Sequence, residues 1–401
     1  MEIIQLIFNI AGLIIFVYFG FFALYFLFFS VASLFYRERY MPNDLPRSKY
    51  AIFIPAYKED QVIVQVAHQA IDHQSQNCSF DVYIIADSLK KETIEKLESL
   101  PLVVIEVSFE QSTKSKALNR AMKIVNKIYD YAIVLDADNV MEPGFIDRIN
   151  DTLNEGFIVV QGHRKDKNKN TSFAILDAVS EAVNNSIFRK GHRVTGLSAA
   201  LIGSGFAIKY EYFKKLMKDI HAVGGFDKEL EIKIIRDNVR IGFSDKAVVL
   251  DEKVQKSEVF ARQRRRWLSA QFIYFSRYFF TACRELLIHR NIDFFDKIIQ
   301  MVSPPRVLQL GLTGLIAIIT WLTGFFTVAA PLAFPGYILW LIVFTISIMA
   351  IILSTPRNFY TWKTMLALLH LPKAFFLMLL ALFRLKGANK KFIHTQHGDH
   401  L

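Results

Sequence analysis

The feature that most limits how this chain can fold is a long apolar segment at its start. No charged residue occurs between Ile3 and Tyr36. A helix needs about 20 predominantly apolar residues to span the hydrocarbon core of a bilayer. A signal peptide would have a shorter apolar region behind a basic start, whereas Glu2 is the only early charge. We therefore predict a transmembrane helix over residues 1–36.

A second uncharged segment follows much later, between residues 307 and 356. Pro331 and the Pro335-Gly336 pair interrupt it near its middle, where they favour a turn. The pattern predicts two more spans, over 307–330 and 337–355, joined by a short outer turn.

A third apolar segment, over 364–383, gives a weaker signal because Pro372 and Lys373 lie inside it. It either spans the membrane with a kink or lies at the interface.

Basic residues predict which side of the membrane holds the polar middle of the chain. Four of them follow the first span directly: Arg37, Arg39, Arg47 and Lys49. Positive charge beside a span marks its cytoplasmic end, so the middle should be cytosolic, in a plasma (bacterial inner) membrane protein. The two cysteines, Cys78 and Cys283, are expected to be reduced there.

The basic tail conflicts with a count of four spans. Four crossings would put the C-terminus outside, yet the tail carries residues that prefer the inside: Arg384, Lys386, Lys390 and Lys391. The tail also holds His394, His397 and His400, which favour a polar end or a cytosolic lid over a metal site.

Composition excludes several classes of protein. Hydrophobic residues make up 52% and charged residues 21%, which excludes a disordered chain and a collagen-like fibre. Two cysteines are too few for a disulfide scaffold or a zinc cluster. The net charge of +11 is concentrated beside the predicted spans, and no nucleic-acid-binding motif occurs, so we expect no nucleic-acid partner.

The polar middle, from residue 50 to about 250, alternates between strand-like and helix-like segments. Four apolar runs predict strands: YAIFIPAY, DVYIIAD, LVVIEV and YAIVLDAD. The segments QVIVQVAHQAI and KSKALNRAMKIVNKI have helical spacing. This alternation predicts an α/β domain with a mostly parallel sheet and helices on both faces. Ligands of such sheets bind at the carboxyl ends of the strands. The chain has no GxGxxG after the first strand and no P-loop.

Acidic residues stand where ligands of the predicted sheet would bind. Asp87 ends one strand, and Asp136 and Asp138 end another. Both carboxylates of the Asp136-Ala137-Asp138 segment reach one ligand only if the chain turns there. Hard oxygen ligands of this kind suit Mg²⁺ or Mn²⁺, which bridge to phosphate oxygens.

Two basic segments could bind anions. Lys114 and Lys116 open a predicted helix, and a helix start with lysines favours an anion, although a solvated cationic turn is about as common. Gln263-Arg264-Arg265-Arg266-Trp267 precedes the later spans, where arginine and tryptophan are also ordinary membrane anchors.

Taken in order, these motifs resemble one family. The chain carries IPAYKED, IIADS, KSKALN, DAD, QGH, IGSG, an acidic helix start and QRRRW. This set resembles membrane-embedded family 2 glycosyltransferases, close to the processive cellulose, hyaluronan, chitin and poly-N-acetylglucosamine synthases. The resemblance covers about residues 50–270 and the flanking membrane layout. It implies a cytosolic GT-A-like nucleotide-sugar-binding domain flanked by transmembrane and interfacial helices.

The resemblance also implies a role for each matching residue. Asp138 would hold the metal, and Gln161 would lie beside the diphosphate. The other donor-binding residues would be Pro55, Tyr57, Glu59, Asp87, Lys114, Asp136, His163, Gln263 and Arg266. The acceptor would meet Gly203, Ser204, Gly205 and Trp267.

The catalytic base is the position where the chain departs from the family. The family usually has Thr-Glu-Asp at a helix start, whereas this chain reads FDKELE over residues 226–231. We expect Glu229 to accept the proton of the acceptor hydroxyl, with Asp227 as the competing base. Glu231 is expected to be an exposed acid on the helix face.

The expected organisation has five parts: a transmembrane helix (1–36), a cytosolic glycosyltransferase domain (37–262), QxxRW and interfacial helices (263–306), a C-terminal transmembrane region (307–385) and a basic tail (386–401). The expected activity is inverting, metal-dependent transfer from a UDP-sugar to a growing polysaccharide, with coupling to translocation left open. Because three or four spans make a narrow channel at best, a homo-oligomer or an accessory membrane subunit is a candidate partner. The alternatives are single-sugar transfer to a lipid acceptor and a catalytically inactive membrane scaffold. The motifs do not specify the sugar.

Overall fold

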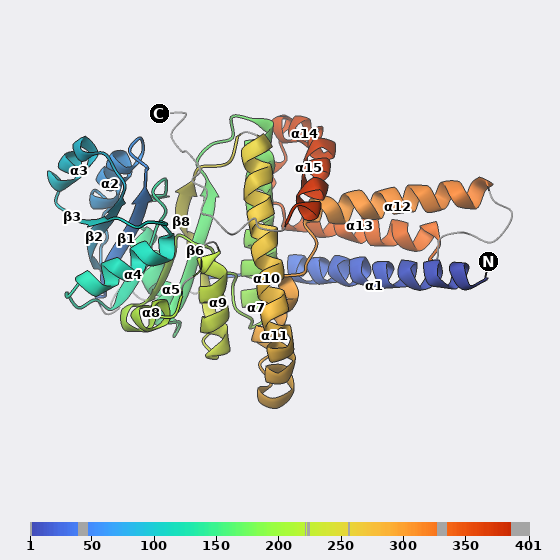
Figure 1. Cartoon of the computed structure of the whole chain (residues 1–401), viewed down its shortest axis with the longest axis horizontal. Coiled ribbons are helices and arrows are strands. Elements are labelled where there is room, and N and C mark those ends of the chain that lie inside the picture. Colours follow the sequence, from blue (N-terminus) through green and yellow to red (C-terminus); the bar gives the residue numbers. More distant parts are fainter. Residues whose placement is uncertain are drawn as a thin grey trace.

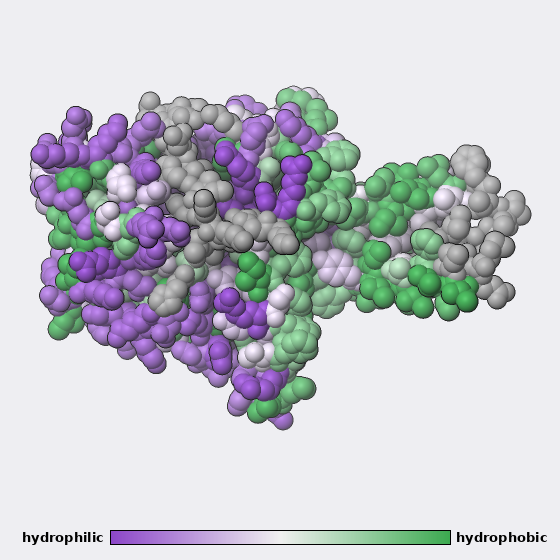
Figure 2. All heavy atoms as spheres, in the orientation of Figure 1, coloured by the Kyte–Doolittle hydropathy of each residue, from purple (hydrophilic) through white to green (hydrophobic). Residues whose placement is uncertain are grey.

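A computed structural model describes residues 2–38, 47–220, 222, 225–255, 257–326 and 335–385. The chain has an α/β region at one end and three long helices that project from the other (Figure 1). Further helices run across the junction between these two parts. Figure 2 shows hydrophilic residues mainly over the α/β region and hydrophobic residues over the projecting helices.

The α/β region is built on one eight-stranded sheet, with the strand order β3-β2-β1-β4-β7-β6-β8-β5. Its strands are β1 (Lys49–Tyr57), β2 (Ser79–Asp87), β3 (Val103–Val107), β4 (Tyr131–Val134), β5 (Val140–Met141), β6 (Val159–Asp166), β7 (Phe206–Lys209) and β8 (Ile241–Asp251). The four strands predicted from the sequence are β1 to β4, and they pair in parallel as expected.

The second half of the sheet makes it mixed. β7 runs antiparallel to β4 and β6, and β5 runs antiparallel to β8, while β6 and β8 are parallel. The order of the strands changes direction between β1 and β4, because β2 and β3 lie on one side of β1 and β4 on the other. Ligands of open α/β sheets bind outside the strand ends at such a point.

Helices cover both faces of the sheet, as predicted. One face packs against α4 (Lys114–Ile124), α8 (Tyr210–Met217) and α9 (Phe226–Arg236). The other packs against α2 (Ile63–Ile71), α3 (Lys91–Glu98) and α5 (Phe145–Asn154). Apolar residues repeat at helical spacing in each of these segments, so each helix buries one face.

Three projecting helices are long and apolar enough to cross a membrane: α1 (Glu2–Ser33), α12 (Arg306–Phe326) and α13 (Tyr337–Ser354). They correspond to the three stronger spans predicted from the sequence. Phe19 and Ala23 of α1 pack against Trp340 and Val343 of α13. Gln309 of α12 donates to the Phe19 carbonyl and to Ser347, which ties the three helices together.

The junction contains the remaining helices. These are α6 (Ser172–Asn184), the π-helix η1 (Asn185–Gly191), α7 (His192–Val194), α10 (Ser257–His289), α11 (Ile292–Gln300), η2 (Arg357–Phe359), α14 (Trp362–Leu368) and α15 (Leu371–Phe383). The weaker apolar segment forms α14 and α15, which are bent by 47° relative to each other, with Pro372 as the second residue of α15.

Some predictions fall on residues that the structure does not describe. Arg39, Pro331 and the tail from Lys386, with its three histidines, lie outside the described residues. The expected boundary between residues 262 and 263 falls inside α10, which already begins at Ser257.

Candidate active site

The Asp136-Ala137-Asp138 segment forms the turn that the sequence required. It follows β4. The backbone amide of Asn139 donates to the Asp136 carbonyl at 3.1 Å. The side-chain oxygen of Asn139 accepts from the backbone amide of Asp136 at 3.2 Å. Asn139 also donates to Asp138 at 3.2 Å and to Asp251 at 3.3 Å. Since Asn139 is buried, it fixes the turn and links its acids to a second strand.

Asp251, at the end of β8, completes a cluster of three carboxylates with Asp136 and Asp138. One oxygen from each lies within 4.8 Å of the other two, so the three could hold one metal ion. Lys253 lies 2.8 Å and Arg164 3.6 Å from Asp251. Burial would raise the pKa of Asp251, but the charges of Arg164 and Lys253 outweigh it and lower the pKa. The carboxylate is therefore ionised and positioned before any ligand arrives.

Lys114 connects the acidic cluster to the loop between α7 and β7. The first residue of α4, it forms an ion pair with Asp136 and donates to the Gly203 carbonyl at 2.6 Å. Thr113 caps this helix, accepting from the Lys116 amide. The lysine thus lies at a helix start beside the acids, as the anion-site prediction required. Lys116 turns away to the Gln111 carbonyl.

The first two strands end in strained turns at the same edge of the sheet. Tyr57 and Asp87 occupy paired positions at the ends of β1 and β2. The residues that follow them, Lys58 and Ser88, have positive φ values of 58° and 59°. Non-glycine residues rarely adopt this conformation, and such outliers gather at functional sites. Of the predicted residues nearby, Asp87 and Glu59 are buried and Pro55 is half-buried.

Gln161 holds the loop that contains Gly203, Ser204 and Gly205. Its amide donates to the Ser204 and Gly205 carbonyls at 3.0 and 3.1 Å, and its oxygen accepts from the Ile202 amide at 2.9 Å. The Gln161 side chain is completely buried, so it holds the loop from the protein interior. The hydroxyl of Ser204 is buried without a hydrogen-bond partner in the described chain.

Gly205 cannot be replaced without moving this loop. Its φ is +66°, and a Cβ would overlap Val249. We expect Gly205→Ala to cost about 2–5 kcal/mol, the sum of about 1–2 for the left-handed conformation and about 1–3 for overpacking. Thermal unfolding of the full chain in detergent measures this cost, with Gly196→Ala as the control. Gly196 also has positive φ but open space around it. Equal losses in the two variants would contradict the packing argument.

His163 makes its hydrogen bond away from the acidic cluster. It follows a β-bulge in the β6–β8 pair and bonds to Asp245 at 2.7 Å. Lys190 of η1 also pairs with Asp245, at 2.8 Å. Burial would raise the pKa of Asp245, but His163 and Lys190 together lower it. The structure therefore places His163 in a polar group with η1.

The acidic start of α9 separates into three different environments. Asp227 lies beside Gly203. A Cβ added to Gly203 would be 3.9 Å from the Cβ of Asp227 and 3.9 Å from the Nζ of Lys114. Burial is the main cause of the raised pKa of Asp227. The charge of Glu231 raises this pKa further, whereas Lys228 and Lys114 lower it. Glu229 is half-buried. The pKa of Tyr274 of α10 is raised mainly by burial and then by the charges of Glu229 and Asp227, so both acids lie near this ring.

The expectation that Glu231 is an exposed acid is wrong. Its carboxylate is fully buried and accepts from the Leu201 amide at 2.8 Å. Lys228 lies 3.0 Å and Lys297 3.4 Å from it. Sequence spacing alone did not reveal this, because the neutralising Lys297 comes from α11.

The QRRRW segment forms the second and third turns of α10. Arg264 forms an ion pair with Asp177 of α6, and its guanidinium lies 4.5 Å from the centre of the Trp267 ring. Trp267 remains 37% exposed. Burial lowers the pKa of Arg266. The side-chain oxygen of Gln263 is buried with no hydrogen-bond partner among the described residues.

α10 brings this segment close to the acidic start of α9. Ala270, one turn after Arg266, lies against Gly225. A Cβ added to Gly225 would be 3.2 Å from the Cβ of Ala270. Gly225 in turn precedes Phe226 and Asp227. Arg266 is therefore one helical turn along α10 from the residue that contacts the start of α9.

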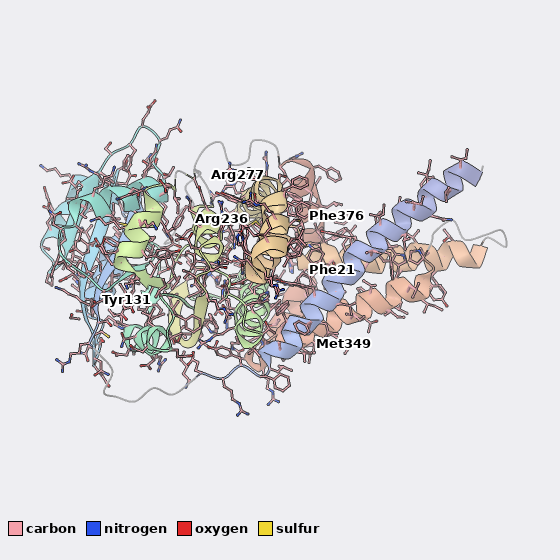
Figure 3. The ribbon with its side chains drawn as sticks, turned by 90° about the horizontal axis from the view of Figure 1, so that it is seen from below. Phe21, Tyr131, Arg236, Arg277, Met349 and Phe376 are labelled. Carbon is pink, nitrogen blue, oxygen red and sulfur yellow. The ribbon has the colours of Figure 1, made fainter. Side chains whose placement is uncertain are left out.

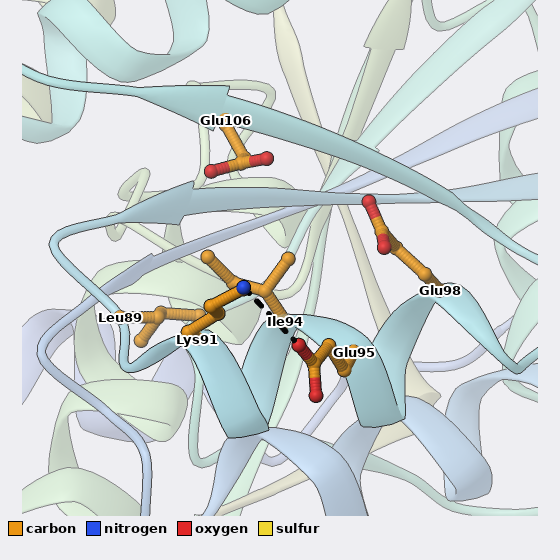
Figure 4. Close-up of a pocket in the computed structure, with 6 residues that line it drawn as sticks. All are labelled: Leu89, Lys91, Ile94, Glu95, Glu98 and Glu106. Carbon is orange, nitrogen blue, oxygen red and sulfur yellow. Dashed lines mark ion pairs between the residues drawn. The ribbon is translucent and has the colours of Figure 1, made fainter.

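A hollow elsewhere on the sheet edge does not fit the predicted chemistry. It lies between α3 and β3 and is lined by Leu89, Lys91, Ile94, Glu95, Glu98 and Glu106 (Figure 4). Lys91 pairs with Glu95, which leaves an acidic surface that disfavours phosphates. None of the predicted site residues lines it.

Sequence reasoning missed Asp251 and Asn139. Asp251 ends the apolar run AVVLD, so the strand-end rule that selected Asp87 could have selected it too. Asn139 had no comparable signal, because its role depends on β8 lying next to β5.

Comparison with known proteins agrees with this geometry. Residues 46–270 match the family model "Glycosyltransferase like family 2". A probable glycosyltransferase, YdaM of Bacillus subtilis strain 168, is 24% identical over 319 residues, which is 71% of this chain and 72% of that protein.

A solved structure shares the fold beyond the matched domain. The mannosyltransferase PcManGT from Pyrobaculum calidifontis, in complex with GDP-Man and Mn²⁺, superposes with a TM-score of 0.51 at 14% identity. The match covers 85% of this chain and 97% of that one, so the likeness of fold extends to the helices outside residues 46–270.

Proposed function

Because the chain belongs to the glycosyltransferase-like family 2, we propose that it transfers sugars from a UDP-sugar to a growing polysaccharide at the cytosolic face of a membrane. The enzyme class follows from the family, whereas the UDP donor, the polysaccharide and the membrane are our proposal. The single observation that carries it is the grouping of Asp136, Asp138, Asp251 and Lys114 at the carboxyl edge of the sheet, in a chain with three apolar helices long enough to span a bilayer.

The donor would lie across the ends of β1, β2 and β4. We assign the nucleoside to the strand ends that carry Pro55, Tyr57 and Asp87 and to Glu59, beside the strained residues Lys58 and Ser88. The diphosphate would meet Lys114, together with Gln263 and Arg266 of α10. The buried, unpartnered oxygen of Gln263 supports a ligand at this position. We keep His163 as a more distant support of the donor site, since it bonds to Asp245.

The acidic cluster fits a divalent cation. Three carboxylate oxygens within 4.8 Å of one another form a hard donor set that suits Mg²⁺ or Mn²⁺. Asp138 and Asp251 would hold the ion, with Asp136 facing the nucleotide side. When bound, such an ion neutralises charge on the leaving diphosphate.

Removing one member of the cluster should weaken metal binding directly. We expect Asp138→Asn to lower Mn²⁺ affinity at least tenfold, because a formal charge and a hard ligand are lost. The electron paramagnetic resonance signal of free Mn²⁺, titrated with protein in the absence of donor, measures this. Asp166→Asn is a matched control, because Asp166 pairs with Lys169 outside the cluster. Equal affinities in the two variants would overturn the assignment.

We propose Asp227 as the catalytic base, in place of the expected Glu229. Asp227 lies beside the Gly203 loop and its pKa is raised by burial, which suits a carboxylate that must accept a proton near neutral pH. The acceptor hydroxyl oxygen would attack the anomeric carbon as its proton passes to Asp227. The bond from that carbon to the diphosphate oxygen breaks on the opposite side, so the configuration inverts.

The acceptor would enter between the Gly203-Ser204-Gly205 loop and Trp267. Gln161 donates a hydrogen bond to the loop, and one face of Trp267 is covered by Arg264. An exposed aromatic ring offers the stacking surface that sugars need.

The test is UDP release by purified protein with Mn²⁺, screened over UDP-sugars, with the products sized. A long product from one donor supports the proposal. Turnover only with a GDP-sugar would overturn the UDP assignment, and no turnover despite nucleotide binding would favour an inactive scaffold.

One observation favours single-sugar transfer to a lipid acceptor as the second candidate. The three projecting helices pack closely through Phe19, Ala23, Ala317, Trp340 and Val343. Such packing leaves little room for a glycan between them within one chain, so a polymer channel would need a second copy or another subunit. A product carrying one sugar on lipid would support this alternative.

A further inference from the structure

The segment that forms α14 and α15 has one face packed on protein and one face uncovered. Ala367, Ala374, Met378 and Ala381 are buried. The opposite face exposes large apolar side chains at helical spacing: Trp362 76%, Met365 54%, Leu369 74%, Phe376 61%, Leu380 51% and Phe383 81%. A stripe of this size on a described surface requires a covering partner.

The geometry argues against a transmembrane path for this segment. α15 has 13 residues, so it is about 20 Å long, shorter than the roughly 30 Å hydrocarbon core. The bend of 47° prevents α14 from extending it in line. α15 runs across the direction of α1, α12 and α13 and alongside α10 (Figure 1).

Its contacts place this segment at the start of α12. The Phe375 ring lies against Gly311, where any Cβ would overlap it. Gly311 is about 8 Å along α12 from its first residue, Arg306. Two residues before Phe375, Lys373 lies 5.6 Å from the ring of Phe173 on α6. Phe376 accordingly lies beside the base of the projecting helices rather than along their far half (Figure 3).

The charge of the segment identifies the partner. Arg357, Lys363, Lys373 and Arg384 are exposed along it, and the sequence has no acidic residue between Asp296 and Asp399. An apolar stripe with a basic border fits the interface of a bilayer that contains anionic lipids. Figure 2 shows hydrophobic surface that continues from α14 and α15 onto the projecting helices.

We propose that α14 and α15 lie flat in the cytosolic headgroup layer and do not cross the membrane. The chain then crosses three times, through α1, α12 and α13, and residue 385 lies on the same side as the catalytic domain. This removes the conflict between four spans and a basic tail. The inference rests on the membrane placement in the proposed function.

Thiol labelling in sealed vesicles tests separately whether the projecting helices cross the membrane and whether α14 and α15 stay on the cytosolic side. In a chain with Cys78→Ala and Cys283→Ala, single cysteines would be placed by Gly336→Cys, Arg357→Cys and Phe383→Cys, and each exposed to a membrane-impermeant maleimide. In right-side-out vesicles we expect only Gly336→Cys to react. In inverted vesicles we expect Arg357→Cys and Phe383→Cys to react.

The possible failures differ. If Phe383→Cys reacts together with Gly336→Cys, the segment crosses and the inference is wrong, while the membrane placement stands. If all three positions react from one side, the three helices do not cross and the membrane placement itself fails. A UDP-release assay on each variant confirms that it is folded.

A fluorescence experiment tests the depth of the segment and its preference for anionic lipids. Quenching of Trp362 fluorescence by brominated lipids, taken as the difference between the parent chain and Trp362→Phe, should show a shallow position near the headgroups. Replacing Lys363 and Lys373 by Gln should weaken this quenching in vesicles of anionic lipid but not in neutral ones. Deep quenching at the bilayer centre would overturn the flat placement.

Discussion

Asp227→Asn is expected to lower sugar transfer by about 10²–10⁴-fold while donor binding changes little, because the variant loses the proton acceptor but keeps the site's shape. The assay is initial UDP release with the acceptor saturating, alongside calorimetric titration with UDP. Glu229→Gln is the matched control, because it makes the same carboxyl-to-amide change at the same helix start, and we expect it to retain activity within a few-fold. The opposite ranking would restore Glu229 as the base.

The pH dependence of this prediction has a definite sign. Asp227 has a folded-state pKa above its ordinary value of 3.8. Transfer should therefore fall as the pH drops through that raised pKa, because the base becomes protonated. A raised acid pKa also means that ionised Asp227 opposes folding above that pKa. Asp227→Asn should then melt at the same temperature as the parent chain or higher, which separates lost catalysis from lost structure.

The elements that local patterns specify were predictable from the sequence. Each of the four predicted strands is a short apolar run, and its neighbours in a parallel sheet follow from the alternation with helices. The three long apolar helices were predictable because a long uncharged segment has few other stable placements. Lys114 and the turn at Asp136 and Asp138 were also predictable, because helix starts and strand ends have fixed geometry in this fold.

The parts that depend on distant contacts were not predictable. The antiparallel insertion of β7 beside β4 brings the Gly203 loop to Lys114, and no local pattern specifies that pairing. The crossing of α15 over Gly311 likewise depends on tertiary packing. Asp227 lies beside Gly203 through the tertiary placement of that loop, so residue spacing could not rank Asp227 and Glu229.

The network around Glu231 shows how the junction helices hold the active-site loop. Lys297 of α11 donates to the Ser198 carbonyl at 3.3 Å, and Asp293 of the same helix accepts from the Ser198 amide at 2.9 Å. Glu231 holds Leu201 in the same loop. Two residues later the loop reaches Gly203, beside the candidate base. The position of α11, which leads into α12, therefore constrains the loop that contains Gly203.

Glu231→Gln is expected to destabilise the fold by about 3–5 kcal/mol, because it leaves buried ammonium charge without a carboxylate. Lys297, whose side chain is 2% exposed, bears most of this cost, whereas Lys228 is 25% exposed and can reach water. The double variant Glu231→Gln, Lys297→Met should therefore recover much of the loss. Thermal unfolding in detergent compares both with Glu229→Gln, which tests the same substitution outside the network. If the double variant melted no higher than Glu231→Gln, the charge of Lys297 would not be the cause, and the cost would lie in the loop that Glu231 holds.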